Sequence, residues 1–226
     1  MSLPMFILYF AILMIIPIWA QMRVKSAYKK IFTNTCVFWS YRCASCTTDP
    51  RSNGLYDVGI EEVRGQLTDH YDPRSKVVRL SSNNYHGNSV AGAAVAAHEV
   101  GHAIQDQEEY TFLRVRSALV PVASFGSNIS IWLIIGGMIF GLTGLAWLGV
   151  IFMAAAVLFQ FVTLPVEFNA SSRAMDQIIS TGVIRNEEER DTKKVLDAAA
   201  LTYVAGAVVA LMELMRFVLM LLANRD

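Results

Sequence analysis

The chain has 226 residues, of which 54% are apolar and 17% charged, so its charged share lies below the quarter that is usual for a soluble domain. Its 19 Lys and Arg residues balance its 19 Asp and Glu residues, which argues against a nucleic-acid-binding protein because such proteins carry a basic surplus. The composition therefore favours a membrane protein with a soluble portion of ordinary size.

The first predicted element is a membrane anchor. Residues 3–20 carry no charge, and a stretch of this length lies near the lower limit for a helix that crosses a bilayer. No basic residue precedes the stretch, as one would in a cleaved signal peptide, whereas Arg23 and Lys25 follow it. The positive-inside rule then places the N-terminus outside the cell and the following residues in the cytoplasm.

Three cysteines, Cys36, Cys43 and Cys46, come next. A secreted disulfide framework usually has an even count, so free thiols on the reducing side of a membrane are the expected state. Cys43 and Cys46 have the spacing of half a zinc site, but no second pair completes it.

Two short strands are predicted on either side of Asp72-Pro73-Arg74. The second, "KVVRLS", is predicted to be an edge strand, and an edge strand could accept an extended peptide through its free backbone groups.

The stretch "SVAGAAVAAHEVGHAIQ" predicts a helix that Ser89 caps, because alanine favours helix and serine favours the N-cap. His98 and His102 would then lie one turn apart on one face and could bind the same Zn²⁺. Glu99, between them, would be the general base that takes a proton from the attacking water. Zinc lowers the pKa of a bound water from about 15.7 to about 7. Gly101 and Ala103 would allow another segment to approach closely.

The block between Arg116 and Glu167 has no Asp, Glu, Lys or Arg and is too long for one crossing. It predicts a helical hairpin, with helices near 124–140 and 145–164 and a turn at "GLTG". Basic residues on both flanks place both ends of the hairpin in the cytoplasm.

A third protein ligand is needed to complete a catalytic zinc site. We predict Glu167 in "LPVEFNASSRAMDQ", because it is the first charge after the hairpin and the hairpin returns the chain to the cytoplasmic side. The alternative is an acidic residue that simply ends a membrane helix. Asn169, Ser171 or Arg173, which follow on the same helix, could support a ligand from outside the metal shell.

The apolar run 198–223 is a fourth predicted span, with a buried core helix as the alternative. Glu213 and Arg216 lie within it, three residues apart, and are predicted to pair or to face a partner helix or the active site. Lys193 and Lys194 precede the run and again place its start inside.

Further candidates for transition-state donors or outer-shell groups are His70, His86, Arg173 and Tyr203. For the two histidines a structural or surface position is the competing interpretation.

The predicted fold is mainly α-helical with a small β-hairpin or sheet, and it combines a zincin-like domain with about four transmembrane helices. The predicted parts are an anchor at 1–22, a cytoplasmic zincin-like portion at 23–117, the transmembrane hairpin at 118–165, a ligand-carrying helix at 166–197 and a C-terminal transmembrane helix at 198–226.

Several quoted motifs resemble bacterial membrane zinc metallopeptidases of the YugP type, which are neutral, gluzincin-like enzymes. These motifs are "LTDHYDP", "AAHEVGHAIQ", "RSALVPVASFGSN", "LFQFVTLPVEFNASSRA" and "VLDAAALTYVAGA". The likeness is loose over residues 1–30 and close over 53–223. It implies that His98, His102 and Glu167 bind zinc and that Glu99 is the catalytic base.

Residues 31–52 depart from that resemblance, which implies a helix of the form G-L-T-G-x-x-V-A-R-x-I-L at this point. Synonymous codons can be chosen for "WSYRCASCTTDPR" such that the same nucleotides, read one base out of frame, encode G-L-T-G-A-Q-V-A-R-Q-I-L. We therefore hypothesise a compensated pair of frame shifts in this segment, which would also explain why the cysteines cluster there. The nucleotide sequence tests this hypothesis: if its codons do not encode the expected helix out of frame, the hypothesis is wrong.

The sequence therefore predicts a membrane-anchored zinc endopeptidase whose partners are a protein or peptide substrate and the lipid bilayer, with no nucleic acid. Its substrates would be proteins in or near the membrane, as in membrane protein quality control. One alternative is an intramembrane protease with the zinc motif inside a span, and another is a non-catalytic zinc-binding scaffold, which would have no use for Glu99. The sequence specifies neither the substrate nor the oligomeric state.

Overall fold

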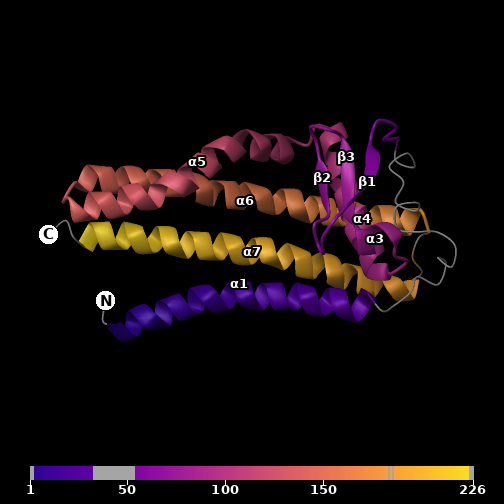
Figure 1. Ribbon diagram of the computed structural model, residues 1–226, viewed down its shortest axis with the longest axis horizontal. Helices are drawn as coiled ribbons and strands as arrows, with labels where there is room; N and C mark the ends of the chain where they lie inside the picture. The colour runs from indigo at the N-terminus through magenta and orange to yellow at the C-terminus, as the bar shows by residue number, and fades with distance from the viewer. Residues whose placement is uncertain (1–2, 33–53, 183, 185, 224–226) are drawn as a thin grey trace. The chain divides into compact units, whose positions relative to one another are not determined.

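The computed structural model describes residues 3–32, 54–182, 184 and 186–223 (Figure 1). The three cysteines and nearly all of the segment with the proposed frame shift lie outside the described residues. In chain order the elements are α1 (Leu3–Phe32), β1 (Gly59–Val63), β2 (His70–Asp72), β3 (Val77–Ser81), α3 (Ser82–His86), α4 (Val90–Gln107), α5 (Thr111–Ile139), α6 (Thr143–Ser180) and α7 (Asn186–Ala223). The predicted fold class, mainly helical with a small sheet, is confirmed.

Four helices in the described part of the chain, α1, α5, α6 and α7, are long and apolar enough to cross a membrane. Large apolar side chains on them are exposed, such as Trp132 at 73% and Ile139 at 72%. Contact with lipid explains this exposure, because water would penalise so much apolar surface. The prediction of about four transmembrane helices therefore agrees with the structure.

The chain forms two compact units. The first comprises residues 1–19, 111–166 and 203–226, and the second comprises residues 20–110 and 167–202. Helices α1, α6 and α7 each contribute residues to both units. Pro165 lies inside α6, which continues past it to Ser180.

In the first unit, α5 and α6 form the predicted hairpin. The connection lies at residues 140–142, where Gly141 has φ of 66°, a left-handed conformation that glycine adopts without strain. A Cβ at Gly137 would lie 2.4 Å from the backbone nitrogen of Ala146, so the two helices touch through backbone at this glycine. On α7 the predicted pair forms, with Arg216 Nη2 donating to Glu213 Oε2 at 2.5 Å.

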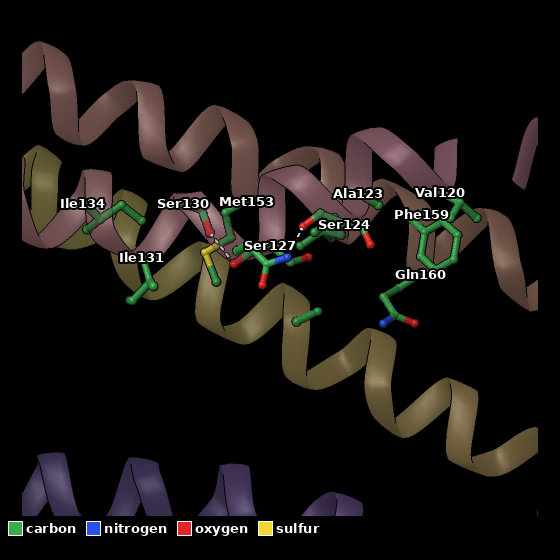
Figure 2. A pocket seen from close by; sticks show the side chains of 14 residues that line it. Val120, Ala123, Ser124, Ser127, Ser130, Ile131, Ile134, Met153, Phe159 and Gln160 are labelled. Carbon is green, nitrogen blue, oxygen red and sulfur yellow. Dashed lines mark hydrogen bonds between the residues drawn. The ribbon is translucent and has the colours of Figure 1, made fainter. Parts of the chain in front are cut away.

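A cavity of about 570 Å³ in this unit is lined by α5, α6 and one residue of α7 (Figure 2). Two polar side chains of its lining, Asn128 and Ser130, bond to backbone carbonyls of helix α5. Asn128 Nδ2 donates to the Ser124 carbonyl at 2.8 Å, and Ser130 Oγ donates to the Ser127 carbonyl at 3.5 Å. Bonds of this kind to the helix's own carbonyls let these two polar side chains lie on an apolar helix.

The second unit contains a three-stranded sheet in the order β1-β3-β2. Strand β3 pairs in parallel with β1 and antiparallel with β2, with Val78 opposite both Ile60 and Tyr71. The hairpin around Asp72-Pro73-Arg74 is confirmed. The prediction that β3 is an edge strand is wrong, because β1, which lies earlier in the chain, pairs along its other side; the edges are β1 and β2.

Most residues of helix α4 are buried, because its alanines allow neighbouring segments to approach closely. It packs on the sheet, where Val78 and Leu80 are fully buried, and on Ala174 and Ile178 of α6. The predicted cap is present, since the Gly92 amide donates to Ser89 Oγ at 3.0 Å. Tyr71 of β2 donates to Asp106 of α4 at 2.8 Å, which links the edge of the sheet to this helix.

Candidate metal centre

Helix α4 presents His98 and His102 on one face, as the spacing of four residues requires. Their ring centroids lie 4.8 Å apart, with the planes at 84° to each other. The side chains are largely buried, at 13% and 12% exposure.

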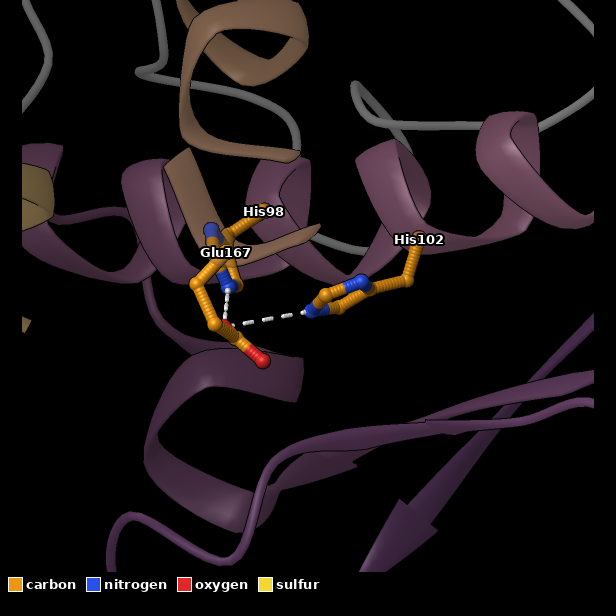
Figure 3. Close-up of side chains that lie close together, drawn as sticks. All are labelled: His98, His102 and Glu167. Carbon is orange, nitrogen blue, oxygen red and sulfur yellow. Dashed lines mark hydrogen bonds and ion pairs between the residues drawn. The ribbon is translucent and has the colours of Figure 1, made fainter. Parts of the chain in front are cut away.

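Glu167 of α6 lies directly opposite these two rings, although it is 69 residues from His98 in the chain (Figure 3). Its Oε2 lies 3.2 Å from His98 Nε2 and 3.5 Å from His102 Nε2. The Glu167 side chain is 2% exposed. One carboxylate oxygen and two imidazole nitrogens thus converge on one point in the second unit.

Close contact between α4 and α6 makes this convergence possible. A Cβ at Gly101 would lie 2.6 Å from the Ala170 carbonyl oxygen, which belongs to the backbone and cannot rotate away. Gly101 is one residue before His102, and Ala170 is three residues after Glu167. The prediction that small residues here admit a neighbouring segment is confirmed.

Replacing Gly101 by alanine should separate the two helices and weaken metal binding. Overpacking of this kind costs about 1–3 kcal/mol, so we expect a lower melting temperature together with a higher dissociation constant for zinc. Gly144→Ala on α6 is the matched control, because a Cβ there would meet no atom within 4 Å. An unchanged zinc affinity in Gly101→Ala would show that this contact does not set the site.

Side chains behind the histidines determine which ring nitrogen faces Glu167. Arg173 Nε donates to Asn169 Oδ1 at 2.7 Å, and because arginine only donates, the atom it meets is the Asn169 oxygen. Gln105 Nε2 donates to the same oxygen at 2.9 Å, so Gln105 Oε1 is the atom 3.0 Å from His102 Nδ1. Nδ1 of neutral His102 must then carry the proton, which leaves the Nε2 lone pair toward Glu167.

His98 also has a partner behind its ring, since Ser171 Oγ lies 3.2 Å from its Nδ1. Arg173 also bonds Glu108 Oε2 at 2.6 Å, which anchors the far end of the hydrogen-bond chain. Of the three residues predicted to support a ligand, Ser171 contacts His98 directly, whereas Asn169 and Arg173 connect to His102 through Gln105.

Electrostatics at His102 favour a positive charge. Burial lowers the pKa of His102, but the hydrogen bond with Glu167 and the negative charges of Glu99 and Glu167 raise it, and the net pKa is above the usual value. Glu99 is itself buried, at 8% exposure. A site that favours a proton on an imidazole also favours a cation in its place.

The three side chains fit a zinc ion. Ligand atoms of one tetrahedral zinc lie about 3.3–3.4 Å apart, given bond lengths of about 2.0–2.1 Å. The Nε2–Oε2 distances of 3.2 Å and 3.5 Å bracket that separation, and all three ligand atoms lie within 4.8 Å of one another. Two imidazoles with one carboxylate are a common catalytic zinc set that keeps a position open. His98, His102 and Glu167 could therefore hold the metal.

Comparison with known families agrees with this chemistry. Residues 6–222 match the family described as "Putative neutral zinc metallopeptidase". The chain belongs to this family. It is also 51% identical over 208 residues to the "Putative membrane protease YugP" of Bacillus subtilis (strain 168), covering 92% of each chain. No solved structure matches the chain.

In this member of the neutral zinc metallopeptidase family, the other candidate residues are not members of the metal cluster. His70 on β2 has its Nδ1 2.8 Å from the Thr68 carbonyl, and the exposed His86 pairs with Glu62 at 3.2 Å. Tyr203 lies on α7 in the first unit. Sequence reasoning did not identify Gln105 as a partner of His102. Its signal was the spacing of three residues from His102 on the same helix face.

Proposed function

We propose that the protein is a membrane-anchored zinc endopeptidase that hydrolyses peptide bonds of proteins in or next to the membrane, as in membrane protein quality control. The observation that carries this proposal is the convergence of His98, His102 and Glu167. The buried Glu99 lies between the two histidines in the sequence. Membership of the zinc metallopeptidase family and the four apolar helices support it.

Within this proposal His98, His102 and Glu167 bind the ion through two nitrogens and one carboxylate oxygen. A bound zinc would lower the pKa of water and polarise the scissile carbonyl. Gln105 and Ser171 orient the two imidazoles, and Asn169 with Arg173 positions Gln105. Because Arg173 is engaged with Asn169 and Glu108, we assign it to positioning.

Glu99 would manage the protons of the reaction. Its carboxylate takes a proton from the attacking water and then passes that proton to the leaving amine nitrogen. It precedes the His102 ligand by three residues on the same helix, and its charge acts on that imidazole. Its burial keeps the carboxylate away from bulk water, which strengthens its interaction with a developing positive charge.

An extended substrate would add to an edge of the sheet. We propose β2, since its Tyr71 is bonded to Asp106 on the helix that carries both histidines. We also propose that the site faces the cytoplasm, because Arg23, Lys193 and Lys194 border the apolar runs of α1 and α7.

Metal removal tests the proposal. The full-length protein in mild detergent should contain about one zinc per chain and cleave a fluorescently labelled casein. Treatment with 1,10-phenanthroline should abolish cleavage, and added Zn²⁺ should restore it, whereas Mg²⁺ should not. Cleavage that survives complete loss of zinc would exclude a zinc peptidase.

The intramembrane alternative is less well supported. The helix that carries His98 and His102 is α4, which packs on the sheet and is not one of the four apolar helices. The scaffold alternative differs from a peptidase in having no use for Glu99, so a Glu99→Gln variant distinguishes the two.

A further inference from the structure

A second cavity, in the second compact unit, lies between α1 and α7 and has a volume of about 580 Å³. We refer to it as the basic groove. From α1 it is lined by Arg23, Ser26, Ala27 and Lys30, and from α7 by Lys194, Asp197, Ala198 and Leu201. None of these residues contributes to the metal cluster.

The lining residues follow the helical repeat on both sides. On each helix they are spaced i, i+3, i+4 and i+7, so one continuous face of α1 meets one continuous face of α7. Three of the four middle positions hold Ser26, Ala27 and Ala198, whose short side chains leave the space, and the fourth holds Asp197. Cations stand at the ends of the groove, which suits a small anionic group between them.

The charge of the lining favours an anion. Three cations and one carboxylate line the groove, so its net charge is +3 − 1 = +2. Lys194 also contacts Asp191 at 2.6 Å, which holds its ammonium near the surface of α7. Arginine can bind a phosphate through two parallel hydrogen bonds, and lysine adds a point charge.

The position along the helices indicates where the anion comes from. Arg23 is the first charged residue after the apolar run of α1, and Asp197 is the last before the apolar run of α7. Both helices are candidate membrane spans, so the groove lies where each apolar stretch gives way to charge. This is the level of lipid headgroups, and basic pockets between membrane helices at this level bind anionic headgroups.

We propose that the basic groove binds the headgroup of an anionic phospholipid. Arg23, Lys30 and Lys194 contact the phosphate, and Asp197 accepts a hydrogen bond from a headgroup hydroxyl. Leu201, at the apolar end of the α7 face, contacts the start of an acyl chain. Binding at this groove ties α1 to α7 within the unit that holds the metal cluster, and it does not depend on peptidase activity.

Lipid-dependent stabilisation of the full-length protein tests the proposal. The protein in neutral detergent is titrated with dioleoylphosphatidylglycerol, with dioleoylphosphatidylcholine or with inorganic phosphate. Melting temperature and lipid adducts in native mass spectra are measured. Phosphatidylglycerol should raise the melting temperature and form a discrete adduct, and the other two should not. An equal effect of phosphatidylcholine or of inorganic phosphate would overturn the assignment to an anionic lipid.

Two triple variants that lose the same charge distinguish a specific lipid site from non-specific attraction of anionic lipid to surface cations. R23Q/K30Q/K194Q removes the groove cations and should weaken phosphatidylglycerol binding about tenfold or more. K25Q/K29Q/K193Q removes exposed cations of the same helices that do not line the groove, and should change binding less than about twofold. Equal losses in the two variants would show that no specific site exists.

A single pair of variants keeps the test usable if the first triple variant does not fold. Lys30→Gln and Lys29→Gln change neighbouring exposed residues, and only Lys30 lines the groove. Lys30→Gln should weaken phosphatidylglycerol binding several-fold while Lys29→Gln leaves it unchanged. The same affinity in both single variants would contradict the proposal.

Discussion

Replacing Glu99 by glutamine should leave zinc bound and reduce casein cleavage about 10²- to 10⁴-fold. Glutamine has nearly the same shape as glutamate, so the buried position on α4 remains filled. The amide cannot take a proton from water, and the proton transfer to the leaving amine is lost with it. Zinc content, melting temperature and kcat/KM, measured on the same preparation, check this result.

The matched control is Glu61→Gln, which removes a carboxylate of the same size from an exposed ion pair with Arg79. Exposed pairs contribute little, so zinc content and activity should both remain. Full activity in Glu99→Gln would remove Glu99 from the mechanism. Wild-type protein that binds zinc but has no cleavage activity on any tested protein would instead favour the scaffold.

Glu167→Gln should weaken zinc binding about 100-fold or more. Loss of a residue that only supports a ligand costs about 10- to 100-fold, and loss of a direct ligand should cost more. The substitution replaces an anionic ligand with a neutral amide that binds zinc poorly. It keeps the side-chain volume at a position that is 2% exposed. A competition titration with a zinc chelator gives the dissociation constant, and activity should fall in parallel at limiting zinc.

Asp176→Asn provides the comparison on the same helix, since Asp176 of α6 is exposed and lies outside the metal cluster. It should bind zinc as wild type does. If Glu167→Gln retained wild-type affinity, the third ligand would have to be another residue, and the assignment of a two-histidine, one-glutamate site would be wrong.

Prediction from sequence succeeded where the decisive relation is local. The four-residue spacing of His98 and His102 places both rings on one helix face whatever surrounds that helix. Ser89 caps the helix because the capping bond spans only a few residues. Long uncharged runs are likewise visible without tertiary information, because bilayer thickness sets the length of a span.

Prediction from sequence failed for contacts between residues that are far apart in the chain. Strand β3 was expected at an edge, yet β1 pairs along its free side, since hydropathy does not specify which strands are neighbours. Gln105 was not recognised, because its role follows from the hydrogen bond to Asn169, 64 residues away. A glutamine near the end of a helix is otherwise unremarkable.

By itself the sequence determined the two imidazoles on one helical face, the glutamate between them and the membrane-spanning character of the long helices. It also nominated Glu167 as the third ligand, with an acidic residue that simply ends a membrane helix as the alternative. The tertiary structure decided that this carboxylate meets both rings, because Gly101 lets the α6 backbone at Ala170 approach α4. It also decided which imidazole nitrogen faces Glu167, through Gln105 and Asn169. Local spacing follows from helix geometry alone, whereas the meeting of two helices depends on how their surfaces pack.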